Sequence, residues 1–103
     1  MGESMSKIRY YRWRIRKVIS EAQRQAKEFK IMASPERPPW KSDLSYFFDA
    51  FIFVVDGNIY VQFAEYKSLL PPIKCEDIEE AVDRVAKWMI KHPSKWHIEW
   101  EKI

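Results

Sequence analysis

The residues of this chain that could do chemistry are mainly arginines and aromatic rings near its start. Between Lys7 and Ile19 the sequence reads KIRYYRWRIRKVI, in which Arg12, Arg14 and Arg16 alternate with aromatic and β-branched residues. Guanidinium groups bind phosphates, and aromatic faces stack on nucleic-acid bases. The pattern therefore predicts a surface that binds RNA or DNA weakly.

Two tyrosines further along the chain extend this predicted surface. Tyr60 lies in the alternating run NIYVQF, and Tyr66 follows that run. The predicted nucleic-acid-binding residues are Arg12, Arg14, Arg16, Tyr60 and Tyr66. The alternative is that the arginines pair with acidic residues of a neighbouring strand, Glu99 and Glu101, because alternating charge on a strand is typical of a solvated sheet face.

Residues suited to catalysis or metal binding are few. The chain has two histidines, His92 and His97, and one cysteine, Cys75, so no Cys/His set has the spacing of a metal site. Its two glycines, Gly2 and Gly57, do not form a phosphate-binding loop. Acidic residues follow Cys75 and oppose a thiolate, so we expect a buried, inert thiol. The sequence predicts a protein that is not an enzyme and that binds no metal or cofactor.

Length and composition predict one small folded domain. The chain has 103 residues, of which 47% are hydrophobic and 32% charged, a balance typical of folded domains. We expect residues 1–6 to be disordered and residues 7–103 to form a single α+β domain. The single cysteine and the absence of a long apolar run favour a cytoplasmic protein that does not enter a membrane. Many charges with few amides is a thermophile-like bias.

Basic charge is concentrated in the first third of the chain. Residues 1–30 contain nine basic and three acidic side chains, whereas residues 31–103 contain nine basic and twelve acidic ones. Clustered basic charge attracts polyanions, so this region is the expected contact for nucleic acid.

The strongest secondary-structure signal is a β-hairpin over Asp49–Phe63. Two apolar runs flank Asp56-Gly57-Asn58, and Asp-Gly is favoured in tight hairpin turns because glycine tolerates positive φ. Alternation in the second run predicts an inward face, and we assign every second residue of the first run to the same face. The residues expected to face inward are Phe51, Phe53, Val55, Ile59, Val61 and Phe63.

The segment from Lys7 to Ile19 fits two secondary structures. Its alternation and its aromatic and β-branched content favour a strand, and Ser20 with Gln23 forms a capping box that would start a helix after it. We therefore predict a strand followed by a helix over residues 20–33. If the segment is helical instead, a basic outer stripe results and remains a nucleic-acid surface; its residues are Arg9, Trp13, Arg16, Arg24 and Lys27.

The remaining signals complete the predicted fold. A capping box of Asp77 and Glu80 begins a helix that runs to Lys91, and alternation over Trp96–Glu101 predicts a closing strand. The element order β-α-β-β-α-β predicts a ferredoxin-like, split βαβ fold, with an antiparallel sheet and two helices on one face. A proline-rich loop over residues 34–45 contains Trp40, which either covers the core or contacts a partner.

The hairpin also carries a distant resemblance to the RNA recognition motif. Aligned with the third-strand signature of that family, Asp56–Phe63 keeps Gly57, Tyr60, Val61 and Phe63 and departs at Asp56, Asn58 and Ile59. The resemblance implies the same element order and a role for Tyr60 in stacking on bases.

Three functions are therefore predicted, in order of preference. The first is weak nucleic-acid binding through a basic, aromatic sheet face. The second is a protein-interaction module, including a homodimer joined through its sheet faces. The third is an enzyme of a class that the sequence does not reveal.

Overall fold

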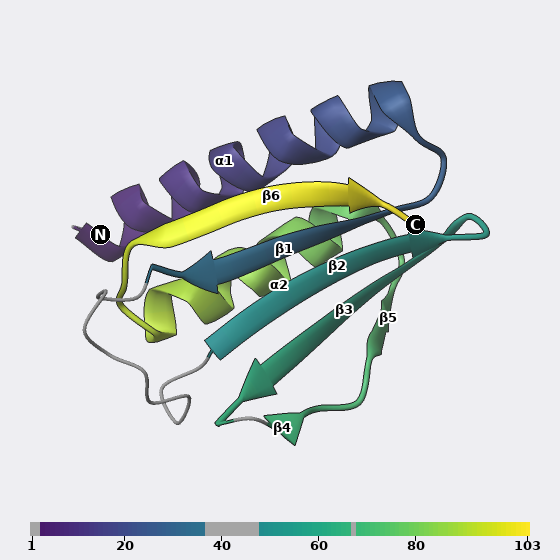
Figure 1. The fold of residues 1–103 in the computed structure, drawn as a ribbon. Coiled ribbons are helices and arrows are strands. Elements are labelled where there is room, and N and C mark those ends of the chain that lie inside the picture. The colour runs from purple at the N-terminus through teal and green to yellow at the C-terminus, as the bar shows by residue number, and fades with distance from the viewer. Residues whose placement is uncertain (1–2, 37–47, 67) are drawn as a thin grey trace.

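The computed structural model describes residues 3–36, 48–66 and 68–103. An antiparallel sheet lies in front of two helices (Figure 1). The elements in chain order are α1 (Glu3–Gln25), β1 (Phe29–Pro35), β2 (Phe48–Val55), β3 (Asn58–Glu65), β4 (Ser68–Leu69), β5 (Ile73–Cys75), α2 (Ile78–Lys91) and β6 (Trp96–Lys102).

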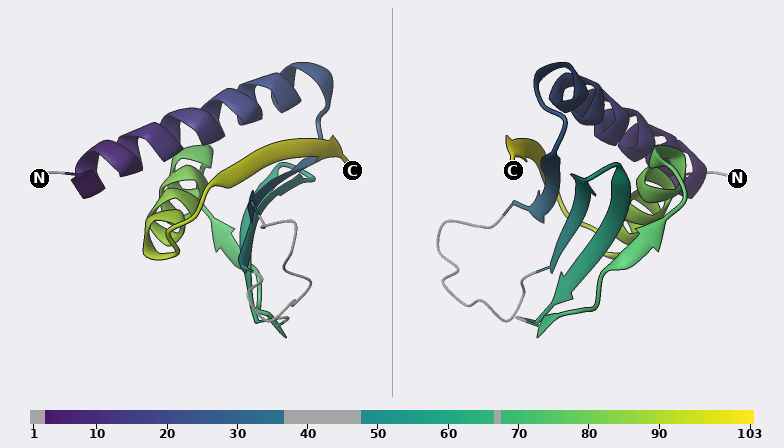
Figure 2. Two further views of the ribbon diagram at one scale, coloured as in Figure 1. Left: turned by 60° about the vertical axis from the view of Figure 1, so that its left-hand side comes forward. Right: turned by 90° about the vertical axis from the view of Figure 1, so that its right-hand side faces the viewer.

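The strands form one sheet in the order β4-β3-β2-β1-β6, and β5 also pairs with β3. Every pairing is antiparallel. Helix α1 contacts β6 and β1, helix α2 contacts β2, β3 and β5, and the two helices contact each other. Figure 2 shows this arrangement from two further directions, with α1 lying along the β6 end of the sheet. The other face of the sheet carries no described helix, and we call it the open face.

The predicted α+β class and the antiparallel sheet with two helices are confirmed, but the ferredoxin-like topology is not. The chain begins with a long helix, and its element order is α-β-β-β-β-β-α-β. The strand order also differs from that of the split βαβ fold. The topology implied by the resemblance to the RNA recognition motif is therefore absent.

The prediction of a strand from Lys7 to Ile19 is wrong, because α1 is continuous from Glu3 to Gln25. Its buried residues recur at intervals of three, four or seven, the spacing of one helical stripe; they are Ile8, Ile15, Ile19 and Ala22. Trp13, which a strand would bury beside Ile15, is 55% exposed. Packing against α2 and the sheet selects the helical period over the alternating one.

The helix predicted over residues 20–33 is also wrong in its second half, which forms β1. Phe29, Ile31 and Ala33 are buried in this strand and alternate with partly exposed residues. Because Phe29 and Ala33 are four residues apart, they fit a helical stripe as well as one face of a strand. Hydrogen bonding to β2 and β6 on its two sides fixes the segment as a central strand.

The β-hairpin is confirmed, with a two-residue turn at Asp56 and Gly57. Both residues have positive φ, 51° and 75° respectively, as a type I′ turn requires. The turn places Ile52 opposite Val61, and both are buried against the helices. Directly paired residues share one face of a sheet, so the inward residues of β2 are Ala50, Ile52 and Val54. The prediction that Phe51, Phe53 and Val55 face inward is therefore wrong; they lie on the open face.

The helix α2 and the strand β6 follow their sequence signals. The Asp77 side chain accepts a hydrogen bond of 2.8 Å from the Glu80 backbone N–H, and Glu80 accepts one of 2.7 Å from the Glu76 backbone N–H. The first bond is that of the predicted capping box, whereas Glu80 binds the N–H of the residue just before the N-cap Asp77. In β6, Trp96, Ile98 and Trp100 lie on the helix side, opposite Pro35, Ala33 and Ile31. The predicted position of Trp40 lies outside the described residues.

Candidate nucleic-acid interface

The three arginines of the predicted site lie on α1, and two of them bind α2. Arg12 forms an ion pair with Asp83, and Arg16 forms one with Glu79, whose two carboxylate oxygens each lie 3.0 Å from Arg16 Nε. Arg12 and Arg16 are four residues apart, as are Glu79 and Asp83, so each pair lies on one side of its helix. Arg12 and Arg16 therefore join the two helices, and Glu101 pairs with Lys30 instead, so the predicted pairing of the arginines with Glu99 and Glu101 is wrong.

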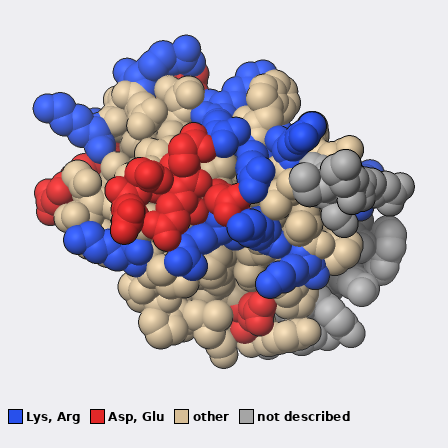
Figure 3. Space-filling model, turned by 180° about the vertical axis from the view of Figure 1, so that it is seen from behind, with Lys and Arg blue, Asp and Glu red and all other residues tan. Residues whose placement is uncertain are grey.

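Hydrogen bonds from cations at this helix contact favour the ionised forms of Glu79 and Asp83. A hydrogen bond from Arg16 lowers the pKa of Glu79. The pKa of Asp83 is lowered first by a hydrogen bond from Lys87 and then by one from Arg12. Figure 3 shows a large patch of acidic side chains on this face with basic side chains around it. The arginines that pair with this patch are partly neutralised, which lowers their attraction for phosphate.

Arg14 has a different partner. Its guanidinium donates a hydrogen bond of 3.0 Å to the Trp96 carbonyl oxygen, and its Cζ lies 5.6 Å from the centre of the Tyr10 ring. It therefore fixes the start of β6 against α1 and borders an exposed aromatic ring.

The outer side of α1 carries exposed aromatic and basic side chains together. Tyr10 and Trp13 are 54% and 55% exposed, and their rings stack with centroids 6.3 Å apart. Lys17 Nζ lies 4.9 Å from the centre of the Trp13 ring, in cation–π distance. Lys7 and Arg9 are exposed on the same helix, and no ion pair joins Lys7, Arg9 or Lys17 to a described residue. We call these five residues the α1 outer face.

Helical spacing explains this grouping. Tyr10, Trp13 and Lys17 are separated by three and four residues and share one side of a helix. The buried stripe through Ile15 and Ile19 occupies the opposite side. Of the outer stripe expected for a helical segment, Arg9 and Trp13 belong to the α1 outer face, whereas Arg16 pairs with Glu79. Arg24 pairs with Glu21.

The two predicted tyrosines lie elsewhere. Tyr60 lies on the open face of the sheet, opposite Phe53 in β2 and Lys74 in β5. Tyr66 follows β3, is 61% exposed, and has a φ of 50°. Its ring contacts Phe48 edge-on, with centroids 5.1 Å apart. The structure therefore does not bring Arg12, Arg14 and Arg16 together with either tyrosine.

The open face combines aromatic rings with charges of both signs. Phe51 and Phe53 stack with centroids 6.0 Å apart. Lys30 Nζ lies 2.7 Å from Glu101 Oε1 and 5.8 Å from the Phe51 ring centre. Glu99 lies beside Glu101 on the same face, since the two are separated by one residue of β6. The described residues of this face carry no excess of positive charge to attract a polyanion.

Sequence reasoning missed an aromatic cluster around His92 at the end of α2. The imidazole stacks on Phe48 with centroids 4.6 Å apart and contacts Trp88 at 4.5 Å. Its Nε2 lies 3.1 Å from Glu65 Oε1. Phe63 also stacks on Trp88, at 5.3 Å. The one sequence signal is that His92 follows the last helical residue; its partners on β2 and β3 depend on the sheet register.

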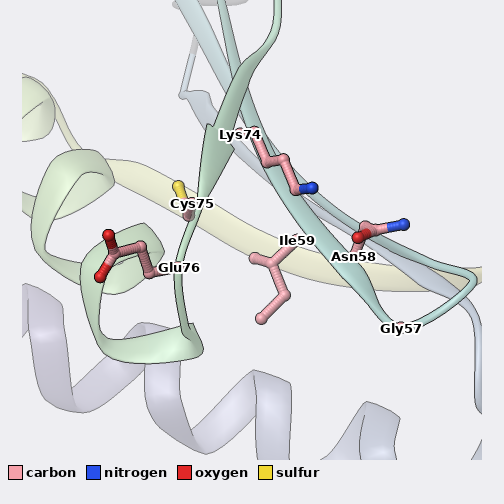
Figure 4. Close-up of a pocket in the computed structure, with 6 residues that line it drawn as sticks. All are labelled: Gly57, Asn58, Ile59, Lys74, Cys75 and Glu76. Atoms are coloured by element: carbon pink, nitrogen blue, oxygen red, sulfur yellow. The ribbon is translucent and has the colours of Figure 1, made fainter.

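A hollow of about 400 Å³ lies between the hairpin turn and the end of β5. Figure 4 shows Lys74 and Asn58 extending to one side of it, while Glu76 points away from them. Cys75 is 4% exposed, and its pKa is raised, first by burial and then by the charge of Glu80. The burial predicted for the Cys75 thiol is confirmed. The charged side chains that line the hollow point in different directions and do not form a common binding site.

Over residues 3–36, 48–66 and 68–103, no three His, Cys, Asp or Glu residues are grouped to hold a metal ion. Within the same ranges, neither helix is long and apolar enough to cross a membrane. No protein-family model matches the chain, and comparisons with curated proteins and with solved structures gave no match.

Proposed function

We propose that the protein binds nucleic acid weakly through the α1 outer face. The observation that carries this proposal is the stacked, half-exposed pair of Tyr10 and Trp13, bordered by Lys7, Arg9 and Lys17. Large aromatic rings are usually buried or engaged with a partner. Exposed rings beside cations that form no ion pair with a described residue match the two contacts that single-stranded nucleic acid offers, bases for stacking and phosphates for charge.

The magnitudes fit a weak interaction. Stacking of one base on an aromatic ring contributes about 1–3 kcal/mol. Three cations that each neutralise one phosphate give a slope of log K against log salt of about −2 for a single strand. Raising the salt from about 50 to about 200 mM then weakens binding by roughly 20-fold. Helix α1 as a whole supports this attraction, with seven basic and two acidic side chains over residues 3–25.

The α1 outer face is a better candidate than the sheet face. On the open face, Lys30 and Lys74 are balanced by Glu99 and Glu101, and Lys30 is already paired with Glu101. Phosphate binding there would have to overcome repulsion from two carboxylates. The role of Arg12, Arg14 and Arg16 in binding remains a prediction. Because they already bind Asp83, the Trp96 carbonyl and Glu79, we expect them to contribute less to binding than the cations of the α1 outer face.

The test is fluorescence polarisation with labelled single-stranded and duplex oligonucleotides at about 50 and about 200 mM salt. We expect salt-sensitive binding that falls at least fivefold in Trp13→Ala and becomes nearly independent of salt in the triple variant Lys7→Gln/Arg9→Gln/Lys17→Gln. A triple variant with the same loss of charge elsewhere, Lys91→Gln/Lys95→Gln/Lys102→Gln, is the matched control. Equal losses in the two triple variants would show a non-specific charge effect and refute the proposed site.

A protein-interaction function is the second candidate, favoured by the β4–β5 edge. Exposed apolar side chains follow one another there; they are Tyr66, Leu69, Leu70 and Ile73, all at least 36% exposed. Exposed apolar residues in a row mark contact sites more often than isolated ones do. If they join two copies of the chain, sedimentation velocity of the wild type will show a dimer that Leu69→Lys/Leu70→Lys converts to monomer.

A further inference from the structure

The strand β6 has a free edge whose backbone orientation follows from two hydrogen bonds. The Glu36 N–H donates to the Lys95 carbonyl at 2.7 Å, and the Ile103 N–H donates to the Glu28 carbonyl at 3.2 Å. Both bonds continue the β1–β6 register. In an antiparallel pair, hydrogen-bonded and non-hydrogen-bonded residues alternate. The odd-numbered residues of β6 therefore direct their backbone groups to β1, and the even-numbered residues direct theirs outward.

Part of this outward edge is open. The Trp96 carbonyl accepts the hydrogen bond from Arg14, as an outward group would. Among the described residues, no strand pairs with this side of β6, and no described side chain binds the backbone of Ile98 or Trp100. An open row of N–H and C=O groups is a template for another strand.

A groove runs beside these open backbone groups. It has a volume of about 530 Å³ and lies between α1 and β6. Val18, Ile98 and Trp100 form its apolar part, and all three are only partly buried. Lys17, Ser20, Glu21 and Arg24 border it on the α1 side, and Glu99 borders it on β6. Side chains from a strand added to β6 would enter this groove at every second residue.

The opposite side of an added strand would meet acidic residues. Its alternate side chains would lie next to His97, Glu99 and Glu101 on the open face of the sheet. Glu101 is paired with Lys30, whereas Glu99 has no ion pair with a described residue. Opposite charges on adjacent strands attract and like charges repel. The matching ligand is therefore an extended segment that alternates apolar residues, for the groove, with basic residues, for Glu99.

We propose that the β6 edge binds an extended segment of another protein with alternating apolar and basic side chains. The segment adds to the sheet as a short strand through the outward backbone groups of Ile98 and Trp100. This is β-strand addition, in which backbone hydrogen bonds give affinity and alternate side chains give specificity. The surface is separate from the α1 outer face except for Lys17, so its test does not depend on nucleic-acid binding.

The test uses three labelled synthetic peptides and fluorescence anisotropy. The parent is acetyl-Lys-Val-Lys-Val-Lys-Val-Lys-amide. The second peptide is N-methylated at its central valine, and the third at a central lysine. When the peptide runs antiparallel to β6 with its valines in the groove, the valine N–H points to β6 and the lysine N–H points away from it. We expect binding of the parent and of the lysine-methylated peptide, and binding roughly tenfold weaker for the valine-methylated peptide.

Charge reversal gives the second measurement. Glu99→Lys should weaken binding of the parent peptide roughly fivefold. The control Glu76→Lys, at an exposed acid just before the N-cap of α2, should leave binding within twofold of the wild type. A cationic peptide that merely adheres to the acidic residues of α2 would bind equally in both methylated forms and would be weakened by Glu76→Lys at least as much as by Glu99→Lys. Either of those results, or no binding of the parent peptide, overturns the proposal.

Discussion

The contact between Asp83 and Arg12 gives the sharpest test of how the two helices are held together. The Asp83 carboxylate pairs with Arg12 on α1 and lies 2.7 Å from Lys87 on its own helix. The side chains of Arg12 and Asp83 are 31% and 33% exposed, so water screens the pair only partly. Exposed pairs contribute about 0.2–1 kcal/mol each. We expect Asp83→Asn, which keeps the shape and removes the charge, to lower the free energy of unfolding by about 1 kcal/mol.

The pH dependence of this loss follows from the lowered pKa of Asp83. A carboxyl whose pKa is lower in the folded state adds stability above its unfolded pKa, about 3.9. That stability is lost as the pH falls through the folded pKa. The difference between wild type and Asp83→Asn should therefore be full at pH 7 and disappear toward about pH 2. In thermal unfolding it corresponds to a change in Tm of about 4–8 °C at pH 7.

Urea unfolding of four proteins isolates the contact between the helices. The set is the wild type, Arg12→Ala, Asp83→Asn and the double variant, with Lys87→Ala as the control that removes only the pair within α2. We expect a coupling energy between Arg12 and Asp83 of about 0.5 kcal/mol or more. Additive effects of the two substitutions, or a loss that is unchanged at about pH 2, would refute the ion pair as the cause.

Three further predictions concern the turn, the tryptophans and the cysteine. Gly57→Ala should cost about 1–2 kcal/mol in urea unfolding, because Gly57 has a φ of 75° and, beyond its two chain neighbours, no described residue has an atom within 4 Å of an added Cβ, so backbone strain alone acts. Trp13→Ala should change stability by less than about 0.5 kcal/mol, whereas Trp88→Ala, which removes contacts with Phe63, His92 and Trp96, should cost about 3 kcal/mol. Cys75 should react with a thiol reagent at pH 7 more than tenfold more slowly in the native protein than in urea, because burial raises its pKa; equal rates would contradict this.

Local signals determined the hairpin, α2 and β6 from the sequence alone. Asp56-Gly57 is a pair that favours a type I′ turn, and the Asp77–Glu80 capping box fixes the start of a helix. Each depends on contacts between residues that are close in the chain, so the sequence is sufficient. The alternation of Trp96, Ile98 and Trp100 likewise gave the inward face of β6 correctly.

Tertiary structure decided the beginning of the chain. The residues from Lys7 to Ile19 fit both a period of two and a period near 3.6, and only burial of Ile8, Ile15 and Ile19 against distant elements selects the helix. Tertiary contacts also decided the next segment, which forms β1 because it pairs with β2 and β6. They also changed the candidate site: the partners Glu79 and Asp83 lie more than sixty residues away from Arg16 and Arg12.

The sequence by itself therefore located a basic and aromatic segment, and the fold decided which of its side chains are available. Alternation pointed to Arg12, Arg14 and Arg16, which the packing of α1 against α2 and β6 engages. The same packing leaves Tyr10, Trp13 and Lys17 on the outer side of the helix. The physical reason is that a helix turns by about 100° per residue, so the side that meets the core also determines the side that meets solvent.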